Sequence, residues 1–164
     1  MADPTAPVDP RTAVPAAPAD VGGSGRAIVH GSAIAWLGRG ILLLGRPGSG
    51  KSDLALRLID AGALLVADDL VALEAAGNRL VARAHGSPGL IELRGQGIFR
   101  LAAQAEAAID VVVRLGPATE PVERLPPAGR VALAGVALPA FDLDPFPASA
   151  VARLRLLATG ERVF

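Results

Sequence analysis

Residues 45–52 carry the feature that most constrains this chain. They read Gly-Arg-Pro-Gly-Ser-Gly-Lys-Ser, the full phosphate-loop pattern, between an apolar run at 40–44 and a helical pattern at 52–61. A strand before the motif and a helix after it are the context that the pattern requires, whereas a glycine-rich turn that merely ends a strand is the alternative. Glycines let backbone N–H groups turn toward phosphates, and the helix N-terminus adds positive potential. We therefore expect a nucleotide site.

Each residue of the loop has an expected part in that site. The predicted nucleotide-binding residues are Gly45, Arg46, Pro47, Gly48, Ser49, Gly50, Lys51 and Ser52. Lys51 would bridge the outer phosphates of ATP, and the Ser52 hydroxyl would face Mg²⁺. Lys51 is also the only lysine, since the other 15 of the 16 basic residues are arginines. A compact ammonium fits among phosphate oxygens better than a planar guanidinium.

Short apolar runs punctuated by glycine surround the motif. They predict strands at 27–29, 32–37, 40–44, 64–67, 71–74, 79–84 and 109–115, and a closing helix at 148–158. The helix at 52–61 has a buried stripe that includes Leu54 and Leu58, and Gly62 ends it. Strand, helix and strand within about thirty residues form a βαβ unit. The class is α/β.

Composition limits the number of domains and excludes several kinds of function. The first 25 residues are rich in proline, alanine and glycine, so we expect a disordered tail at 1–25 and one domain at 26–164. Basic and acidic residues number 16 each and aromatic residues make up 3%, which argues against nucleic-acid binding. Cysteine is absent, which favours a cytoplasmic protein. No apolar run reaches the roughly 18 residues of a membrane span.

Asp68 and Asp69 end the predicted strand at 64–67, from which carboxylates can face the phosphate loop. Two neighbouring acids could divide the work, one toward the metal and one toward the proton of a hydroxyl. The alternative is an Asp-rich turn, because Asp tolerates turn geometry.

His30 and Glu92 are weaker candidates on their own. A lone histidine such as His30 is more often a structural hydrogen-bonding group than a catalytic one. Glu92 lies in a segment, 89–98, where charges alternate with apolar residues between glycines. That pattern fits an exposed strand face or a flexible loop with a metal-binding carboxylate, and periodicity does not choose between them.

Four segments together resemble one known family. Ile-Val-His-Gly at 28–31, the phosphate loop, Leu-Leu-Val-Ala-Asp-Asp at 64–69 and Ile-Glu-Leu-Arg-Gly-Gln-Gly-Ile at 91–98 resemble the catalytic domain of bacterial HPr kinase/phosphorylase in order and spacing. The resemblance spans roughly residues 26–125. It implies a phosphate-loop α/β fold with a central mixed sheet, of the HPr kinase/PEP carboxykinase type. Family members use ATP to phosphorylate a serine of HPr, the phosphocarrier of the sugar phosphotransferase system, and many reverse the reaction.

The resemblance also implies roles for individual residues. Ser52 and Glu92 would hold Mg²⁺, and Asp69 would be the base that takes the serine proton. His30 would sit beside Asp69 as a catalytic-site member, and Asp68 would belong to the nucleotide site. Arg124 matches the family's further active-site arginine, and its charge would neutralise the transferred phosphoryl group.

Two departures from the family pattern shape the expected activity. Only the proline-rich tail occupies the place of the N-terminal domain of longer members. The Pro-x-x-x-Gly-Arg-Asn stretch associated with dephosphorylation is not recognisable, and Val-Ala-Leu-Ala-Gly-Val-Ala-Leu-Pro stands at 131–139 instead. Kinase activity is therefore better supported than phosphorylase activity.

We interpret the chain as an ATP- and Mg²⁺-dependent kinase for a serine of an HPr-like phosphocarrier, and the resemblance implies a homo-oligomer, commonly a hexamer. One alternative is a phosphate-loop kinase or ATPase for a small molecule, although the sequence shows no obvious arginine-rich lid. The other is a regulatory sensor that binds ATP without turnover, against which Asp69 and Glu92 both argue.

Overall fold

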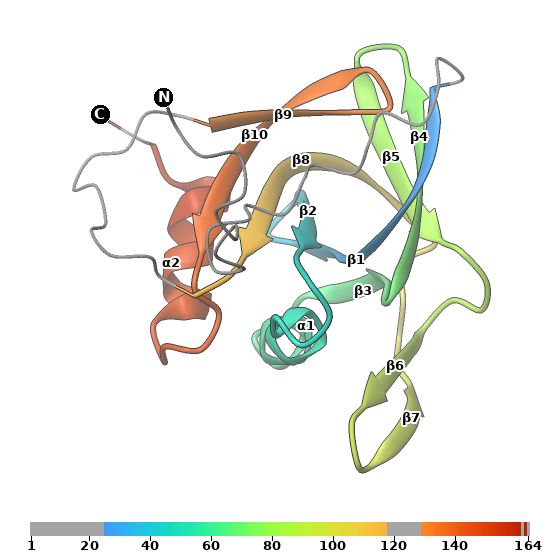
Figure 1. Ribbon diagram of the computed structural model, residues 1–164, viewed down its shortest axis with the longest axis vertical. Coiled ribbons are helices and arrows are strands. Elements are labelled where there is room, and N and C mark those ends of the chain that lie inside the picture. Colours follow the sequence, from blue (N-terminus) through green and yellow to red (C-terminus); the bar gives the residue numbers. More distant parts are fainter. Residues whose placement is uncertain (1–24, 118–128, 162, 164) are drawn as a thin grey trace, which may run out of the picture.

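The computed structural model describes residues 25–117, 129–161 and 163, which form ten strands and two helices (Figure 1). The elements are β1 (Arg26–Trp36), β2 (Arg39–Leu44), α1 (Lys51–Asp60), β3 (Leu64–Ala67), β4 (Leu70–Ala76), β5 (Arg79–Ala84), β6 (Leu90–Leu93), β7 (Gly97–Arg100), β8 (Glu106–Leu115), β9 (Gly129–Leu133), β10 (Val136–Leu143) and α2 (Ala150–Thr159). The α/β class is confirmed. The tail predicted at 1–25 falls almost wholly outside the described residues, so the domain boundary stays a prediction.

Most of the strands join one mixed sheet that curls back on itself. The described residues give an eight-stranded sheet in which β1 pairs with β4, β4 with β5, β5 with β8, β8 with β2, and β2 again with β1. These pairings close a ring. β10 extends the sheet parallel to β8, and β9 pairs antiparallel with β10. The separate ribbon β6–β7 projects away from this body, at the lower right of Figure 1.

The direction of the strands places their connecting loops. β2 and β3 both run antiparallel to β1, which lies between them, so they are parallel to each other and α1 connects them as predicted. β8 is parallel to β2, and β10 is parallel to β8. The loops that follow β2, β3, β8 and β10 therefore lie at the same end of the sheet. This is the carboxyl end of the parallel strands, where α/β sheets commonly bind their ligands.

The predicted break between strands at 27–29 and 32–37 is wrong, because β1 is continuous from Arg26 to Trp36. Its first half pairs with β4 and its second half pairs with β2. Gly31 lies at the change of partner, where a Cβ atom would approach the carbonyl oxygen of Leu43 to 2.8 Å. The glycine thus marks a close approach of two strands rather than the end of one.

Apolar side chains fill both faces of this sheet. One buried cluster lies within the ring and includes Val29, Leu42 and Leu73. The other lies between the sheet and the two helices, and it includes Leu43, Leu54 and Leu154. Because Leu42 and Leu43 face opposite clusters, β2 is buried on both sides, as its continuous apolar run predicts. Among the described residues, no helix has the length and apolar character needed to cross a bilayer.

We expect Gly40→Ala to destabilise the fold. A Cβ atom at Gly40 would collide with the carbonyl oxygen of Ala108 where β2 meets β8, and backbone at a sheet junction moves only at a cost. Overpacking of this kind costs about 1–3 kcal/mol or more. Urea denaturation would measure the loss. Gly116→Ala is the matched control, because a Cβ atom there meets none of the described residues within 4 Å; equal loss in both variants would contradict the explanation.

Candidate functional site

The loop between β2 and α1 has the geometry of an anion cradle. Gly48 and Gly50 adopt positive φ values of 79° and 91°, which side chains other than glycine rarely adopt. The Ser49 N–H bonds the Arg46 carbonyl at 3.0 Å, and the Leu54 N–H bonds the Gly50 carbonyl at 2.9 Å. Among the described residues no side chain caps the start of α1. The first N–H groups of the helix therefore remain open to an anion.

Gly45 and Ser49 pack against each other inside the loop. A Cβ atom at Gly45 would collide with Ser49 Oγ, so the first glycine of the motif is needed for this close approach. The Ser49 Oγ atom is buried and has no hydrogen-bond partner in the described part of the chain. An unsatisfied buried hydroxyl costs free energy, so a hydrogen bond from this hydroxyl to an anion bound in the loop would remove that cost.

The Lys51 ammonium bonds the first two residues of the phosphate loop. It donates hydrogen bonds to the carbonyl oxygens of Gly45 at 2.9 Å and Arg46 at 3.0 Å. Partial burial lowers its pKa, while the nearby carboxylates of Asp68 and Asp69 act in the opposite direction. A desolvated cation held at the loop gains from a multiply charged anion, because charge pairs strengthen where water is excluded.

Asp68 connects three elements of the site. Its carboxylate accepts hydrogen bonds from Ser52 Oγ at 2.9 and 3.1 Å and from the buried Ser32 Oγ at 2.7 Å. The hydroxyl at the start of α1 is thus joined to the end of β3 and to β1. Hydroxyl and carboxylate oxygens are the donors that Mg²⁺ prefers, so Ser52 and Asp68 form a pair fit to hold this ion.

Asp69 is exposed to solvent and lies beside His30. His30 Nδ1 and Asp69 Oδ1 are 3.8 Å apart, and their side chains are 74% and 83% exposed. Asp69 adopts a φ of 69°, a conformation that Asp tolerates better than most residues. The Gly31 N–H bonds the Asp69 carbonyl at 3.0 Å and fixes this turn beside β1. A carboxylate so placed can meet a macromolecular hydroxyl that comes from solvent.

Glu92 lies on β6 of the projecting ribbon, with an exposed side chain. The ribbon contacts α1 through β6, and in the described residues the Ser52 hydroxyl bonds the Asp68 carboxylate. Within the described residues no group of three or more His, Asp or Glu side chains lies close enough to form a metal site. The metal-binding role of Glu92 therefore stays a prediction.

We expect Glu92→Gln to raise the Mg²⁺ concentration needed for half-maximal activity by roughly tenfold or more, the scale seen when metal sites lose a supporting group. A titration of activity against Mg²⁺ measures the change. The control is Glu161→Gln, which removes an exposed carboxylate beyond α2. If the wild type, Glu92→Gln and Glu161→Gln gave the same Mg²⁺ titration, Glu92 would not bind the metal and would belong only to the exposed strand face.

Of two further segments named in the sequence analysis, the structure describes one. Arg124 lies outside the described residues, so its role stays a prediction. The apolar stretch at 131–139 is a hairpin formed by β9 and β10, which pair from Val136 and Leu133 outward.

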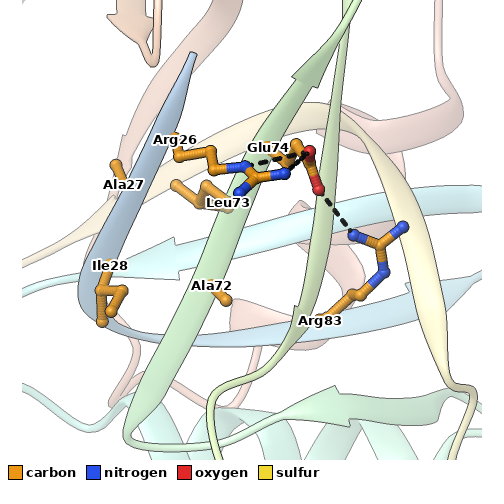
Figure 2. Close-up of a pocket in the computed structure, with 7 residues that line it drawn as sticks. All are labelled: Arg26, Ala27, Ile28, Ala72, Leu73, Glu74 and Arg83. Carbon is orange, nitrogen blue, oxygen red and sulfur yellow. Dashed lines mark hydrogen bonds and ion pairs between the residues drawn. The ribbon is translucent and has the colours of Figure 1, made fainter. Parts of the chain in front are cut away.

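A hollow in the described surface lies apart from this site. Figure 2 shows this hollow on the outer side of β1, β4 and β5, with Arg26 and Arg83 both reaching Glu74. Arg26 bonds Glu74 at 2.8 and 3.1 Å and Arg83 bonds it at 3.0 Å, so these charges satisfy one another. The hydrogen bond and charge of Arg26, aided by Arg83, lower the pKa of Glu74. No candidate residue from the sequence lines this hollow.

The structure adds residues that the sequence patterns did not single out. Ser32 positions the Asp68 carboxylate, and its signal is a single hydroxyl in the second half of β1, whose other residues from Gly31 to Trp36 are glycine or apolar. Pro145 and Phe146, which follow β10, lie against Gly50 of the phosphate loop. No local motif marks them, because Pro145 lies 95 positions after Gly50 in the sequence.

Comparisons with known proteins agree with this geometry. The family described as HPr Serine kinase C-terminal domain matches residues 24–140. The HPr kinase/phosphorylase of Treponema pallidum is 46% identical over 76 residues, which cover 44% of this chain and 24% of that protein. The HPr kinase/phosphorylase of Mycoplasma pneumoniae is 42% identical over 74 residues, 44% of this chain and 24% of that protein. The aligned part thus spans about a quarter of each curated relative.

A solved structure supports the fold over a greater length. The HPr(Ser) kinase/phosphatase of Coxiella burnetii superposes with a TM-score of 0.68 at 24% identity, covering 80% of this chain and 97% of that chain. The mixed α/β fold that the resemblance implied is therefore confirmed. Since the family match covers well over half of the sequence and includes the phosphate loop, both aspartates and β6, this chain belongs to the HPr serine kinase C-terminal domain family.

Proposed function

We propose that this chain transfers the γ-phosphoryl group of ATP to a serine of HPr or of an HPr-like phosphocarrier, with Mg²⁺. The observation that carries the proposal is the division of the two aspartates. Asp68 is tied to Ser52 at the phosphate loop, whereas Asp69 is free to face an incoming hydroxyl. Family membership supports the choice of acceptor, because the matched relatives are named HPr kinase/phosphorylase.

The residues of the site have complementary parts in this reaction. Backbone N–H groups of the loop and the Lys51 ammonium hold the phosphates. Ser52 and Asp68 supply oxygen ligands for Mg²⁺, with Glu92 as the further ligand that the family resemblance implies. When bound, Mg²⁺ would neutralise negative charge on the ADP that leaves.

The proton of the acceptor serine needs one group within reach. The serine oxygen attacks the γ-phosphorus, the bond to the β–γ bridging oxygen breaks, and Asp69 takes the serine proton. His30, 3.8 Å from Asp69, orients this carboxylate. Arg124 would neutralise charge on the phosphoryl group. In the reverse direction, inorganic phosphate would attack the phosphorus of phosphoserine, the bond from phosphorus to the serine oxygen would break to give pyrophosphate, and Asp69 would return the proton to serine. This direction has less support, because the stretch associated with dephosphorylation is not recognisable in the sequence.

The decisive experiment mixes the purified protein with ATP, Mg²⁺ and an HPr-type phosphocarrier, then determines the carrier's mass and phosphorylated residue. We expect the addition of one phosphoryl group to a serine, absent when that serine is replaced with alanine. Tight ATP binding without transfer would favour a regulatory sensor. Transfer to a small molecule but not to the carrier would favour a small-molecule kinase. Added inorganic phosphate then tests the reverse reaction.

The family resemblance also supports a proposal for the assembly and the cellular role. We propose a homo-oligomer, a hexamer in the family pattern, that acts in the cytoplasm and regulates the phosphotransferase system and carbohydrate metabolism. Sedimentation equilibrium of the full chain measures the mass of the assembly, and a monomer at working concentrations would contradict the first part.

A further inference from the structure

The loop that follows β10 lies against the phosphate loop. A Cβ atom at Gly50 would be 3.0 Å from Pro145 Cγ, and 3.4 and 3.5 Å from Phe146 Cε1 and Cζ. Gly50 is the N-cap of α1 and follows β2, whereas Phe146 follows β10, which lies two places along the sheet from β2. The two loops meet because β2, β8 and β10 are parallel and end at the same edge. The phenyl ring thus borders the place where phosphates would lie.

Several contacts hold this loop in position. The Arg57 side chain on α1 donates a hydrogen bond to the Pro145 carbonyl and also pairs with Asp53 at 2.9 Å. The Asp144 carboxylate accepts the Phe146 N–H at 3.0 Å. Pro145 itself is buried. The turn that carries the Phe146 ring is therefore held against α1, so the ring is preorganised for binding.

The ring is nevertheless exposed to water. Phe146 is 64% exposed, in a chain that has only four phenylalanines, one tryptophan and no tyrosine. An exposed aromatic ring on a fixed turn beside a phosphate loop has the chemistry of a stacking platform, since a flat π-face gains when a base covers it.

We propose that Phe146 binds the base of the nucleotide by stacking. The proposal rests on the nucleotide site proposed above and deepens it by naming the residue that contacts the base. The phosphates occupy the N-terminus of α1, and the base extends from them toward the neighbouring loops of the same sheet edge, of which the 144–149 loop touches Gly50. Phenylalanine offers no hydrogen bond, so this contact does not distinguish adenine from guanine.

Binding of ATP and of inorganic tripolyphosphate, each with Mg²⁺, tests the proposal by calorimetry on the full chain. Tripolyphosphate has the phosphates and lacks the base. We expect Phe146→Ala to weaken ATP binding roughly tenfold or more, the usual scale for one stacked base, and to leave tripolyphosphate binding unchanged. Phe146→Trp retains a π-face and should bind ATP as the wild type does. Leu156→Ala, which removes a 70% exposed side chain from α2, is the matched control and should bind both ligands normally.

Each other outcome overturns the proposal in a recognisable way. Equal weakening of ATP and tripolyphosphate would show that the ring supports the shape of the phosphate loop. Unchanged ATP binding in Phe146→Ala would place the base elsewhere, and a raised KM for the phosphocarrier in the same variant would make the ring a protein contact. A wild-type protein that binds neither ligand would contradict the proposed nucleotide function itself, which separates that failure from the failure of the stacking contact.

Discussion

Asp69→Asn is expected to lower the rate of phosphoryl transfer by roughly 10²–10⁴, the usual contribution of a general base. The amide cannot take the proton of the acceptor serine, yet it has nearly the same shape as the carboxylate. Asn also tolerates the positive φ of 69° at this position, so the turn after β3 should be preserved. Single-turnover transfer to the phosphocarrier measures the rate, and calorimetry measures ATP binding, which we expect to be unchanged.

The neighbouring carboxylate provides the control for this prediction. Asp68 bonds both Ser52 and Ser32, so Asp68→Asn should weaken Mg²⁺-dependent nucleotide binding as well as transfer. The two variants differ by one position and remove the same charge. If Asp69→Asn also lost ATP binding, Asp69 would have a structural or metal-binding role, and the assignment of the base would be wrong.

The parts of the fold that could be predicted are those governed by local pattern. The strands β3 and β5 have the predicted boundaries of 64–67 and 79–84, because each is a short run closed by turn residues. The continuity of β1 could not be predicted, since Gly31 signals a turn in sequence but serves a close approach to Leu43 in space. Closure of the ring depends on pairing between β2 and β8, which are about seventy residues apart.

The candidate site shows the same division between local and distant information. The phosphate loop and the Asp68–Asp69 pair stand out in the sequence because their spacing alone carries the chemistry. The residue pattern alone leaves open which aspartate faces which partner, and the family resemblance supplied that assignment; in the structure the Asp68 carboxylate bonds Ser52 and Asp69 lies beside His30. The contact of Phe146 with Gly50 joins residues that are far apart in the sequence, so no local pattern near either residue predicts it.

Lys51→Ala is expected to weaken ATP binding roughly tenfold to a hundredfold, the scale of losing one or two hydrogen bonds to a charged group, and to lower transfer at least as much. The ammonium now bonds the Gly45 and Arg46 carbonyls, so it is already placed at the mouth of the loop. Calorimetric titration with ATP measures the affinity. Unchanged binding and kinetics would contradict the assignment of the phosphate loop.

Two further measurements separate this role of Lys51 from a structural one. Burial lowers the pKa of Lys51, so at neutral pH the fold holds a charge that it disfavours, and removing that charge should leave the melting temperature unchanged or raised. Lys51→Arg keeps the charge but brings a planar guanidinium, which cannot replace a compact ammonium between the two carbonyls and the phosphates. We therefore expect the arginine variant to bind ATP weakly as well. If Lys51→Ala loses ATP binding without losing stability, and Lys51→Arg does not restore the binding, Lys51 contacts the phosphates.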